Sequence, residues 1–447
     1  MVRKIVIVGS GAAGMTAAST ARKTDPDAKI TVITEDEHIA YSPCVIPWVL
    51  EGKTSWNNII MHDPEYYSQE RDIEVKTMTK VHSVDLNNKT VDANGDILHY
   101  DSLILATGGK VFIPPIPGKD LNGVFVVRTI NDGKAIESTM KDADRVAIIG
   151  AGAIGLEMAL AIHNVGKKVV VVEMMNQVIP RVLDSDMASE VQCYLEKKGI
   201  RFVMDAPIQS VNGDDIVESV TAAGKTIPCD MVIFSTGVRA NLELPKQMGL
   251  DIGTLGGLRV APSLQPYQKG KLLNNVFACG DLIECESAVA PGPTMSQLGS
   301  SAVRQGRVAG INAAGGHALH EGVTSPWVSV MGDIEIAGTG LSTGLAHWYG
   351  MNVVTGMSSG FTCARYYPGG KNLKVKVLAE RSTGRLIGAQ ILSGKDATGR
   401  INWLSAAILE RVTAREFLSR YENAYCPPTS MVRDVVFTAV EDLASKL

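Results

Sequence analysis

One cysteine stands where a sulfur-based redox reaction is expected. Cys44 lies in the segment 40–48, downstream of a glycine-rich loop at residues 9–14. A thiol redox pair needs two sulfur atoms, and no second cysteine lies within five residues of Cys44. The partner of this sulfur is therefore an oxygen added to Cys44 itself, a small-molecule thiol, or a cysteine brought close by folding. The sequence alone leaves these three possibilities open.

Two glycine-rich loops indicate two dinucleotide sites. Residues 9–14 read Gly-Ser-Gly-Ala-Ala-Gly, and residues 150–155 read Gly-Ala-Gly-Ala-Ile-Gly. Such glycines permit a tight turn and a close approach to a pyrophosphate, whose charge sits at a helix N-terminus. An acid at the end of the next strand, Glu35 or Glu173, can bind an adenosine ribose. Two such loops and one cysteine predict electron transfer from a nicotinamide, through a flavin, to sulfur.

The elements that must position these residues follow an α/β pattern that is present twice. In each copy we expect a buried strand, a helix and a second strand, followed later by a strand that ends in a small turn. The expected elements are the strands Lys4–Val8, Lys29–Thr34, 101–108, Arg145–Ile149, Lys168–Val172, Met231–Phe234 and 275–281, and the helices Ala12–Lys23 and Ala153–Val165.

The composition is that of a globular enzyme. Of the 447 residues, 43 are basic and 47 acidic, with no long run of one sign, which argues against a role on nucleic acid or on a membrane surface. The seven cysteines form no CxxC pair, so we expect a reducing compartment and a cytoplasmic location. We see no signal peptide and no apolar stretch of membrane-spanning length. The eight histidines show no metal-ligand spacing, and we predict no metal site.

Together the motifs resemble the pyridine nucleotide-disulfide oxidoreductases, over essentially the whole chain. The resemblance implies an α/β fold with two Rossmann-like domains and a C-terminal α+β dimerisation domain. The FAD domain would comprise residues 1–110 and 245–320, the NAD(P)H domain 111–244, and the dimerisation domain 325–447. The proline-rich segment 111–118 would be a rigid linker.

The resemblance also implies the cofactors, FAD and NADH, and the residues that bind them. Asp281 would hydrogen-bond a sugar hydroxyl of FAD, and a helix within 294–310 would point at the flavin. Glu173 favours NADH because a carboxylate repels a 2′-phosphate, although nearby basic residues leave NADPH open. The residues implied for FAD are Gly9, Gly11, Ala12, Ala13, Gly14, Glu35, Asp36, Ser42, Val81, Ala106, Thr107, Gly108, Gly280, Asp281 and Leu298. Those implied for the nicotinamide dinucleotide are Gly150, Gly152, Ala153, Ile154, Gly155, Glu173 and Gly237.

Within this family the chain is similar to the single-cysteine branch, because Val49 occupies the place of a second cysteine. That branch includes coenzyme A-disulfide reductases, persulfide and polysulfide reductases, NADH oxidases and NADH peroxidases. A Cys44 thiolate beside the flavin and at a helix start would be stabilised. The resemblance implies a homodimer in which Tyr367 and Tyr425 reach the partner's cysteine. Arg22 and Lys23 would bind the phosphates of coenzyme A, as substrate or bound thiol.

Several departures from the branch keep other functions open. Ala12 occupies the place of the histidine of NADH peroxidases and water-forming oxidases, which argues against peroxide cleavage, and Ala40 occupies that of a serine. Ala153 replaces an aromatic gate over the nicotinamide pocket, which leaves easier access for oxygen. The alternatives are an NADH oxidase that forms hydrogen peroxide, a reductase of a one-electron carrier protein, and a non-enzymatic nucleotide-sensing dimer. Cys426 is either a second redox thiol or a buried structural thiol.

Overall fold

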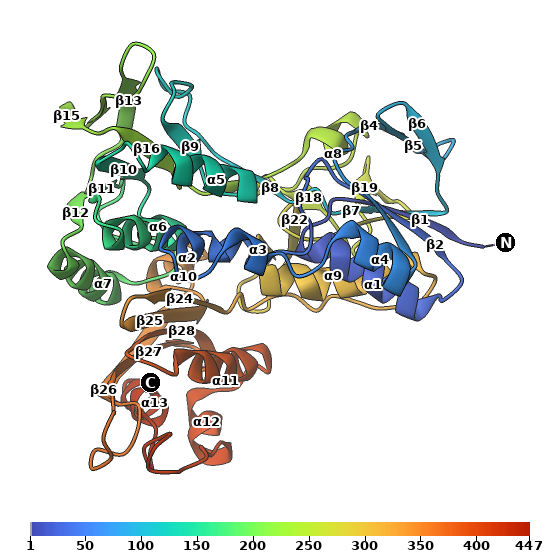
Figure 1. The fold of residues 1–447 in the computed structure, drawn as a ribbon. Helices are drawn as coiled ribbons and strands as arrows, with labels where there is room; N and C mark the ends of the chain where they lie inside the picture. The colour runs from blue at the N-terminus through green and yellow to red at the C-terminus, as the bar shows by residue number, and fades with distance from the viewer. Residues whose placement is uncertain (1) are drawn as a thin grey trace.

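The structure is a computed structural model that describes residues 2–447. Two α/β units lie side by side in the upper part of Figure 1, and a third unit, which holds the C-terminus, lies below one of them. Among the described residues no helix is both long enough and apolar enough to cross a membrane.

The first unit is built on a five-stranded parallel sheet with the order β21-β7-β1-β2-β3. Apolar runs form its strands because both faces of the sheet are covered. The strands are β1 (Lys4–Val8), β2 (Lys29–Ile33), β3 (Ile73–Lys76), β7 (Ser102–Leu105) and β21 (Val276–Ala278). Helices α1 (Ala12–Thr24) and α9 (Gly299–Ala313) pack together, and β4 (Val81–Asp85), β5 (Thr90–Ala93) and β6 (Asp96–His99) form an antiparallel meander.

The second unit repeats this plan with the order β12-β11-β10-β16-β9, again all parallel. The strands are β9 (Val124–Val126), β10 (Arg145–Ile149), β11 (Lys168–Val172), β12 (Arg201–Val203) and β16 (Met231–Phe234). The helices are α5 (Ile130–Thr139), α6 (Ala153–Asn164) and α7 (Ser185–Lys198). The unit also has an antiparallel meander, β13 (Ile208–Asn212), β14 (Ser219–Ala222) and β15 (Lys225–Pro228).

Two chain crossings connect these units and pair with each other. Strand β8 (Gly109–Val111) runs antiparallel to β17 (Val238–Ala240), and the Arg239 guanidinium lies 3.7 Å from the centroid of the Phe112 ring. Both crossings are thus held in one antiparallel ribbon. The division of the chain into domains at fixed residues stays a prediction, although β21 does lie beside β7 in the first sheet.

The third unit is an antiparallel sheet with the order β24-β25-β28-β27-β26. Its strands are β24 (Trp327–Met331), β25 (Ile334–Gly340), β26 (Val353–Phe361), β27 (Asn372–Glu380) and β28 (Leu386–Ser393). Helices α11 (Ala397–Leu409), α12 (Ala414–Arg420) and α13 (Val435–Ala444) share a core with it, and α10 (Thr343–Trp348) follows β25.

Short elements complete the chain. They are a 3₁₀ turn (Pro43–Val45), the helices α2 (Ile46–Leu50), α3 (Trp56–Ile59), α4 (Pro64–Arg71) and α8 (Glu243–Gln247), and the strands β18 (Leu258–Arg259), β19 (Tyr267–Gln268), β20 (Lys271–Leu272), β22 (Ile283–Glu286) and β23 (Pro293–Thr294). The helix expected within 294–310 begins only at Gly299, because Pro293–Thr294 pairs with β22.

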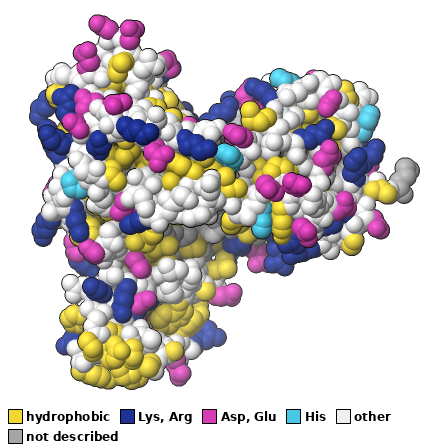
Figure 2. Space-filling model, viewed as in Figure 1, with side chains coloured by type: hydrophobic (Ala, Val, Ile, Leu, Met, Phe, Trp, Pro, Cys, Tyr) yellow, Lys and Arg dark blue, Asp and Glu magenta, His cyan; other side chains and the backbone are white. Residues whose placement is uncertain are grey.

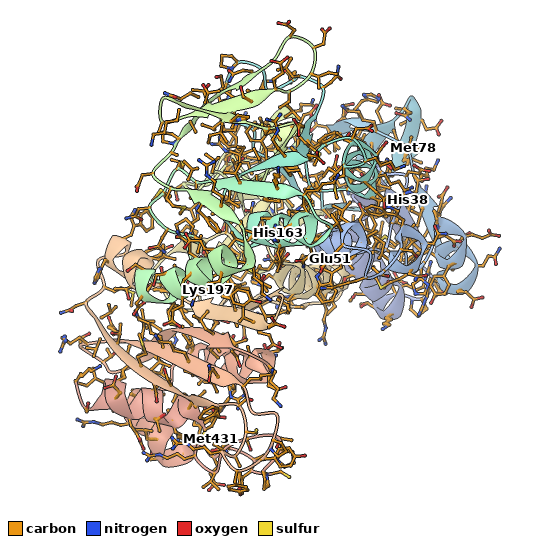
Figure 3. The ribbon with its side chains drawn as sticks, turned by 60° about the vertical axis from the view of Figure 1, so that its left-hand side comes forward. His38, Glu51, Met78, His163, Lys197 and Met431 are labelled. Atoms are coloured by element: carbon orange, nitrogen blue, oxygen red, sulfur yellow. The ribbon has the colours of Figure 1, made fainter. Side chains whose placement is uncertain are left out.

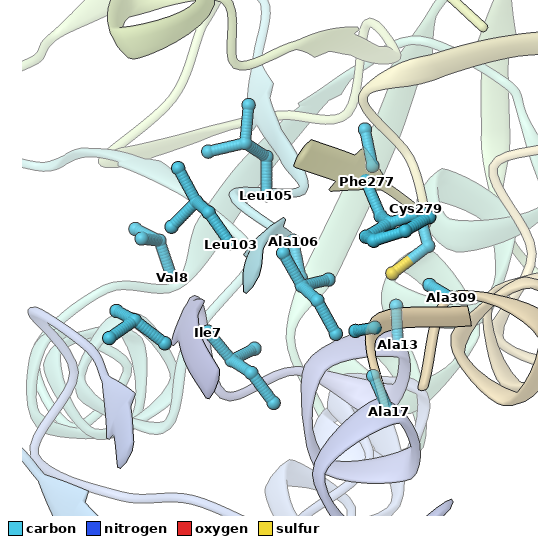
Figure 4. Packing of buried hydrophobic residues seen from close by; sticks show 14 of the residues in the cluster. Ile7, Val8, Ala13, Ala17, Leu103, Leu105, Ala106, Phe277, Cys279 and Ala309 are labelled. Carbon is cyan, nitrogen blue, oxygen red and sulfur yellow. The ribbon is translucent and has the colours of Figure 1, made fainter. Parts of the chain in front are cut away.

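Helices α1 and α9 cross with almost no space between their backbones. A Cβ atom on Gly306 would overlap the carbonyl oxygen of Ala13, and one on Gly310 would overlap that of Ala17. Figure 4 shows Ala13 and Ala17 facing Ala309 beneath the strands of the first sheet. Because α1 begins at Ala12, within the first glycine loop, this crossing helps to fix the position of that loop.

Gly306→Ala is therefore expected to lower the free energy of unfolding by about 1–3 kcal/mol, the usual cost of overpacking a core. Gly299→Ala is the matched control, because a Cβ atom there meets nothing within 4 Å. Thermal unfolding of both variants, with the flavin content of each, is the measurement. If Gly306→Ala unfolds like the parent, the packing of α1 on α9 does not require a glycine at position 306.

Candidate active site

The first glycine loop forms an open cradle at the carboxyl edge of the first sheet. Gly9 has a φ of +111°, and a Cβ atom on it would overlap the carbonyl oxygen of Ala106. Gly14 packs equally closely on Gly9. Gly11, the N-cap of α1, faces open space and offers no side chain to the first-turn N–H groups. These free donors at a helix N-terminus suit a pyrophosphate.

The second glycine loop has the same geometry. Gly150 has a φ of +107°, and Gly152, the N-cap of α6, faces open space without a side-chain cap. Gly155 packs on Gly150, and Ala153 and Ile154 open the helix. The buried Glu173 carboxylate accepts from the Ala151 N–H at 2.7 Å and the Met175 N–H at 2.9 Å. The acid thus lies against the loop; its contact with a ribose stays a prediction.

The other residues implied for FAD follow the strands of the first sheet. Thr107 and Gly108 follow β7, and Gly280 and Asp281 follow β21. The Gly280 N–H donates to Gln305 of α9 at 2.8 Å, which ties this edge to the α9 helix. After β2, Glu35 and Asp36 are both exposed, and desolvation by the surrounding chain raises the pKa of Asp36 above its usual value. Ser42 precedes the 3₁₀ turn, Val81 begins β4, and Leu298 is the N-cap of α9.

Arg128 is a residue of this site that the sequence analysis missed. Its Nη2 lies 2.8 Å from Oδ2 of Asp281, and a Cβ atom on Gly108 would lie 3.5 Å from the same nitrogen. Arg128 follows β9 of the second sheet, so its side chain bridges the two units. Thr129 and Asp132 then cap α5 reciprocally. This capping pattern after a strand was visible in the sequence; the pairing with Asp281 was not.

These features fit a flavin dinucleotide. The uncapped start of α1 and the Arg128 guanidinium would offer positive charge to its phosphates, and Asp281 and Asp36 would offer acceptors to its sugar hydroxyls. When bound, a flavin accepts a hydride from a nicotinamide and passes two electrons to sulfur. In the described part of the chain, no group of three His, Cys, Asp or Glu side chains lies together that could hold a metal ion.

Cys44 is exposed in the 3₁₀ turn that leads directly into α2. The segment around it is clamped to α5. The Trp56 Nε1–H donates to Glu137 at 2.8 Å, and its ring lies so close to Gly133 that a Cβ atom there would overlap it. Ile130 packs in the same small cluster as Val49. The segment that begins with Cys44 therefore packs on α5, and Arg128 lies just before the N-cap of the same helix.

The predicted tyrosines lie on the third unit. The Tyr425 hydroxyl lies 2.6 Å from that of Tyr366, whereas Tyr367, predicted by position, makes no side-chain hydrogen bond in the described structure. The hydrogen bond to Tyr366 raises the pKa of Tyr425. Both segments lie at the foot of Figure 1, away from α2, so they do not meet Cys44 within one chain, and their approach to the partner's cysteine stays a prediction. Figure 2 shows apolar side chains gathered at this end of the molecule.

The remaining predictions concern the basic residues expected to bind phosphate, and Cys426. Arg22 donates to the carbonyls of Pro26, Arg71 and Asp72 and pairs with the Asp72 carboxylate at 2.9 Å, so its guanidinium already joins α1 to α4. Lys23 is exposed, and phosphate binding there stays a prediction. All seven cysteines are free. Cys426 is exposed, so the expectation of a buried structural thiol at this position is wrong.

The structure thus has two uncapped glycine-loop helix starts, an Arg128–Asp281 pair that joins the two units, and an exposed thiol on a segment that packs on α5. Residues 3–306 match the pyridine nucleotide-disulphide oxidoreductase family model, and residues 326–433 match the dimerisation domain of that family. The chain belongs to the pyridine nucleotide-disulphide oxidoreductase family. It is thus a flavin-dependent NAD(P)H oxidoreductase.

Similar proteins span almost the whole chain. An NADH oxidase of Methanocaldococcus jannaschii is 46% identical, covering 99% of each chain. An NAD(P)H coenzyme A polysulfide/persulfide reductase of Pyrococcus horikoshii is 32% identical, covering 97% of each. Among solved structures, an NAD-dependent persulfide reductase from A. fulgidus superimposes with a TM-score of 0.94 at 32% identity, over 99% of this chain and 83% of that one.

Removing the bridging cation is expected to weaken flavin binding. Arg128→Met should lower FAD affinity by roughly 10- to 100-fold, the scale of one hydrogen bond to a charged group. Arg145→Met is the control. Arg145 pairs with Asp230 and lies at the amino end of β10, whereas Arg128 follows the carboxyl end of β9. FAD titration of each apoprotein is the measurement. An unchanged affinity in Arg128→Met would exclude Arg128 from the flavin site.

Proposed function

We propose that the enzyme reduces a small disulfide, persulfide or polysulfide with NADH, through FAD and the single thiol of Cys44. The observation that carries this proposal is the exposed Cys44 at the start of a segment whose Ile46 and Trp56 side chains pack on α5, the helix that follows Arg128. A thiol fixed there is placed to exchange electrons with a bound flavin. Similarity to two persulfide reductases supports the same chemistry.

The reaction needs only one protein thiol. The Cys44 thiolate attacks one sulfur of the substrate, forms a mixed disulfide or persulfide, and releases the first thiolate. A bound flavin would supply the two electrons that cleave this new bond, which would release the second sulfur and regenerate the Cys44 thiolate. For a disulfide the sum is NADH + H⁺ + RSSR′ → NAD⁺ + RSH + R′SH. Coenzyme A disulfide and coenzyme A persulfide are the substrates that the relatives' names favour.

In this proposal the partner subunit completes the site. The chain has a dimerisation domain of the family, which supports a homodimer. The hydroxyl pair of Tyr366 and Tyr425 is exposed on that domain and would donate to a departing thiolate. We therefore assign Tyr425 this role, with Tyr366 as the hydroxyl that orients it and Tyr367 beside them.

A second function, an NADH oxidase that forms hydrogen peroxide, is favoured by a specific observation. The 46% identical relative is named an NADH oxidase, and Ala153 at the start of α6 would present only a methyl group to the nicotinamide side. In that case the sum is NADH + H⁺ + O₂ → NAD⁺ + H₂O₂, and Cys44 would cycle through a sulfenic acid.

The Cys44→Ser variant separates these functions. Under anaerobic conditions the parent enzyme is expected to oxidise NADH with coenzyme A disulfide, coenzyme A persulfide or polysulfide. Cys44→Ser should lose this activity, by about 10³-fold or more since the nucleophile is absent, and should keep flavin reduction by NADH. Cys193→Ser, an exposed cysteine on α7, is the control. The sulfur proposal would be refuted if Cys44→Ser kept full sulfur reductase activity. It would also be refuted if the parent oxidised NADH with oxygen but with none of the sulfur compounds.

Nucleotide preference is expected to depend on Glu173. Glu173→Ala should weaken NADH binding by about 1–2 kcal/mol, the scale of a charge-assisted hydrogen bond, and should weaken NADPH binding much less. Glu196→Ala, an exposed residue near the end of α7, is the control. Dissociation constants come from flavin reduction at varied concentrations of each nucleotide. Equal losses for both would mean that the carboxylate serves only to hold the Ala151 and Met175 N–H groups.

A further inference from the structure

A buried lysine of the third unit is bound to the second dinucleotide unit. Lys376 of β27 is 7% exposed, and its Nζ lies 2.9 Å from Oδ2 of Asp184 and 2.7 Å from Oδ2 of Asp186. Both acids belong to the start of α7, which lies against the strands of the third unit in Figure 3, where Lys197 marks this helix. A cation so deeply buried is found where it is fully paired.

Asp184 directs its side chain away from its own helix. It is the N-cap of α7, a position at which aspartate normally accepts from the first-turn N–H groups, but it makes no such bond. Its carboxylate instead accepts from the Thr343 N–H at 2.8 Å and the Thr343 hydroxyl at 2.7 Å, and its own N–H donates to Gln390 at 2.9 Å. Burial would raise the pKa of Asp184, but the bonds from Lys376 and Thr343 outweigh it and hold the pKa below its usual value.

The chain between Asp184 and the second glycine loop is a compact turn. The Leu183 N–H donates to the Ile179 carbonyl at 3.2 Å, and the Ile179 N–H donates to the Ala151 carbonyl at 2.8 Å. Ile179 is buried with a φ of +47°, a conformation that a β-branched residue holds only when its surroundings impose it. Ala151 is the residue between the two glycines at which the nucleotide pyrophosphate is expected.

We propose that Lys376 is a positioning residue for NADH, which acts through Asp184 and the Ile179 turn on the second glycine loop. Lys376 binds Asp184 to the third unit. The turn before Asp184 is thereby held in place, and its Ile179 N–H donates to the Ala151 carbonyl. The loop N–H groups are then fixed in the direction of the pyrophosphate. The inference rests on NAD(P)H use by the family and is independent of the sulfur or oxygen acceptor.

The test compares two lysines of the same strand. Lys376→Met removes the anchor, whereas Lys374→Met removes an ion pair with Glu190 that also joins β27 to α7 but lies one helical turn further along. Stopped-flow reduction of the holoenzyme flavin at varied NADH gives the dissociation constant and the limiting rate separately. Lys376→Met is expected to raise the dissociation constant about tenfold, within the range of mutational effects transmitted between sites. Its FAD content should stay at the parent level, and Lys374→Met should match the parent.

Further variants keep the test decisive if Lys376→Met does not fold. Thr343→Val removes one hydroxyl bond to Asp184 and should also raise the dissociation constant for NADH. Lys376→Arg keeps the positive charge and should bind NADH like the parent. A lower melting temperature with unchanged NADH binding would show that the pair is structural only and would overturn the proposal. An equal weakening in Lys374→Met would overturn it as well. Loss of bound FAD in the Lys376 variant would contradict an effect confined to the second loop.

Discussion

The arrangement of the active site depends on two helix starts that lack a side-chain cap. At Gly11 and at Gly152 the first-turn N–H groups have no protein side chain to bind, and a Cβ atom at either position would face open space. An uncapped helix N-terminus is costly unless water or an anion satisfies its donors. The close packing of Gly9 on the β7 turn, and of Gly150 on the β16 turn, keeps both starts at the carboxyl edges of their sheets. Dinucleotide binding thus completes hydrogen bonding that the protein fold leaves open.

Helix α5 and the residue before its cap contact both the first α/β unit and the segment that holds Cys44. Arg128 precedes its cap and reaches Asp281 of the other sheet, and Gly133 receives the ring of Trp56 from the Cys44 segment. The reciprocal cap of Thr129 and Asp132 fixes where the helix begins. Because these contacts come from both α/β units, the position of Cys44 is set by the relation between the units and not by its own short turn.

Sequence reasoning was strongest where a pattern is local. The strands Lys4–Val8, Arg145–Ile149, Lys168–Val172 and Met231–Phe234 were predicted to the residue, because buried parallel strands read as continuous apolar runs. It failed where a role depends on contacts distant in sequence. Arg128 was not identified from the sequence, Arg22 was expected to bind phosphate, and Tyr367 was chosen where Tyr366 is the neighbour of Tyr425. Side-chain pairing across units cannot be read from spacing alone.

The structure also bears on why similar chains carry both oxidase and sulfur reductase names. Both reactions need the same hydride transfer to flavin, and they differ only in what reaches the reduced flavin first. Here Cys44 is exposed, and the tyrosines that would assist a leaving thiolate lie on the dimerisation unit. Oxygen needs neither the thiol nor the tyrosines. In the proposed sulfur reaction a partner subunit would supply those tyrosines, so assembly of the dimer would favour sulfur over oxygen, whereas reduction of oxygen would not depend on it.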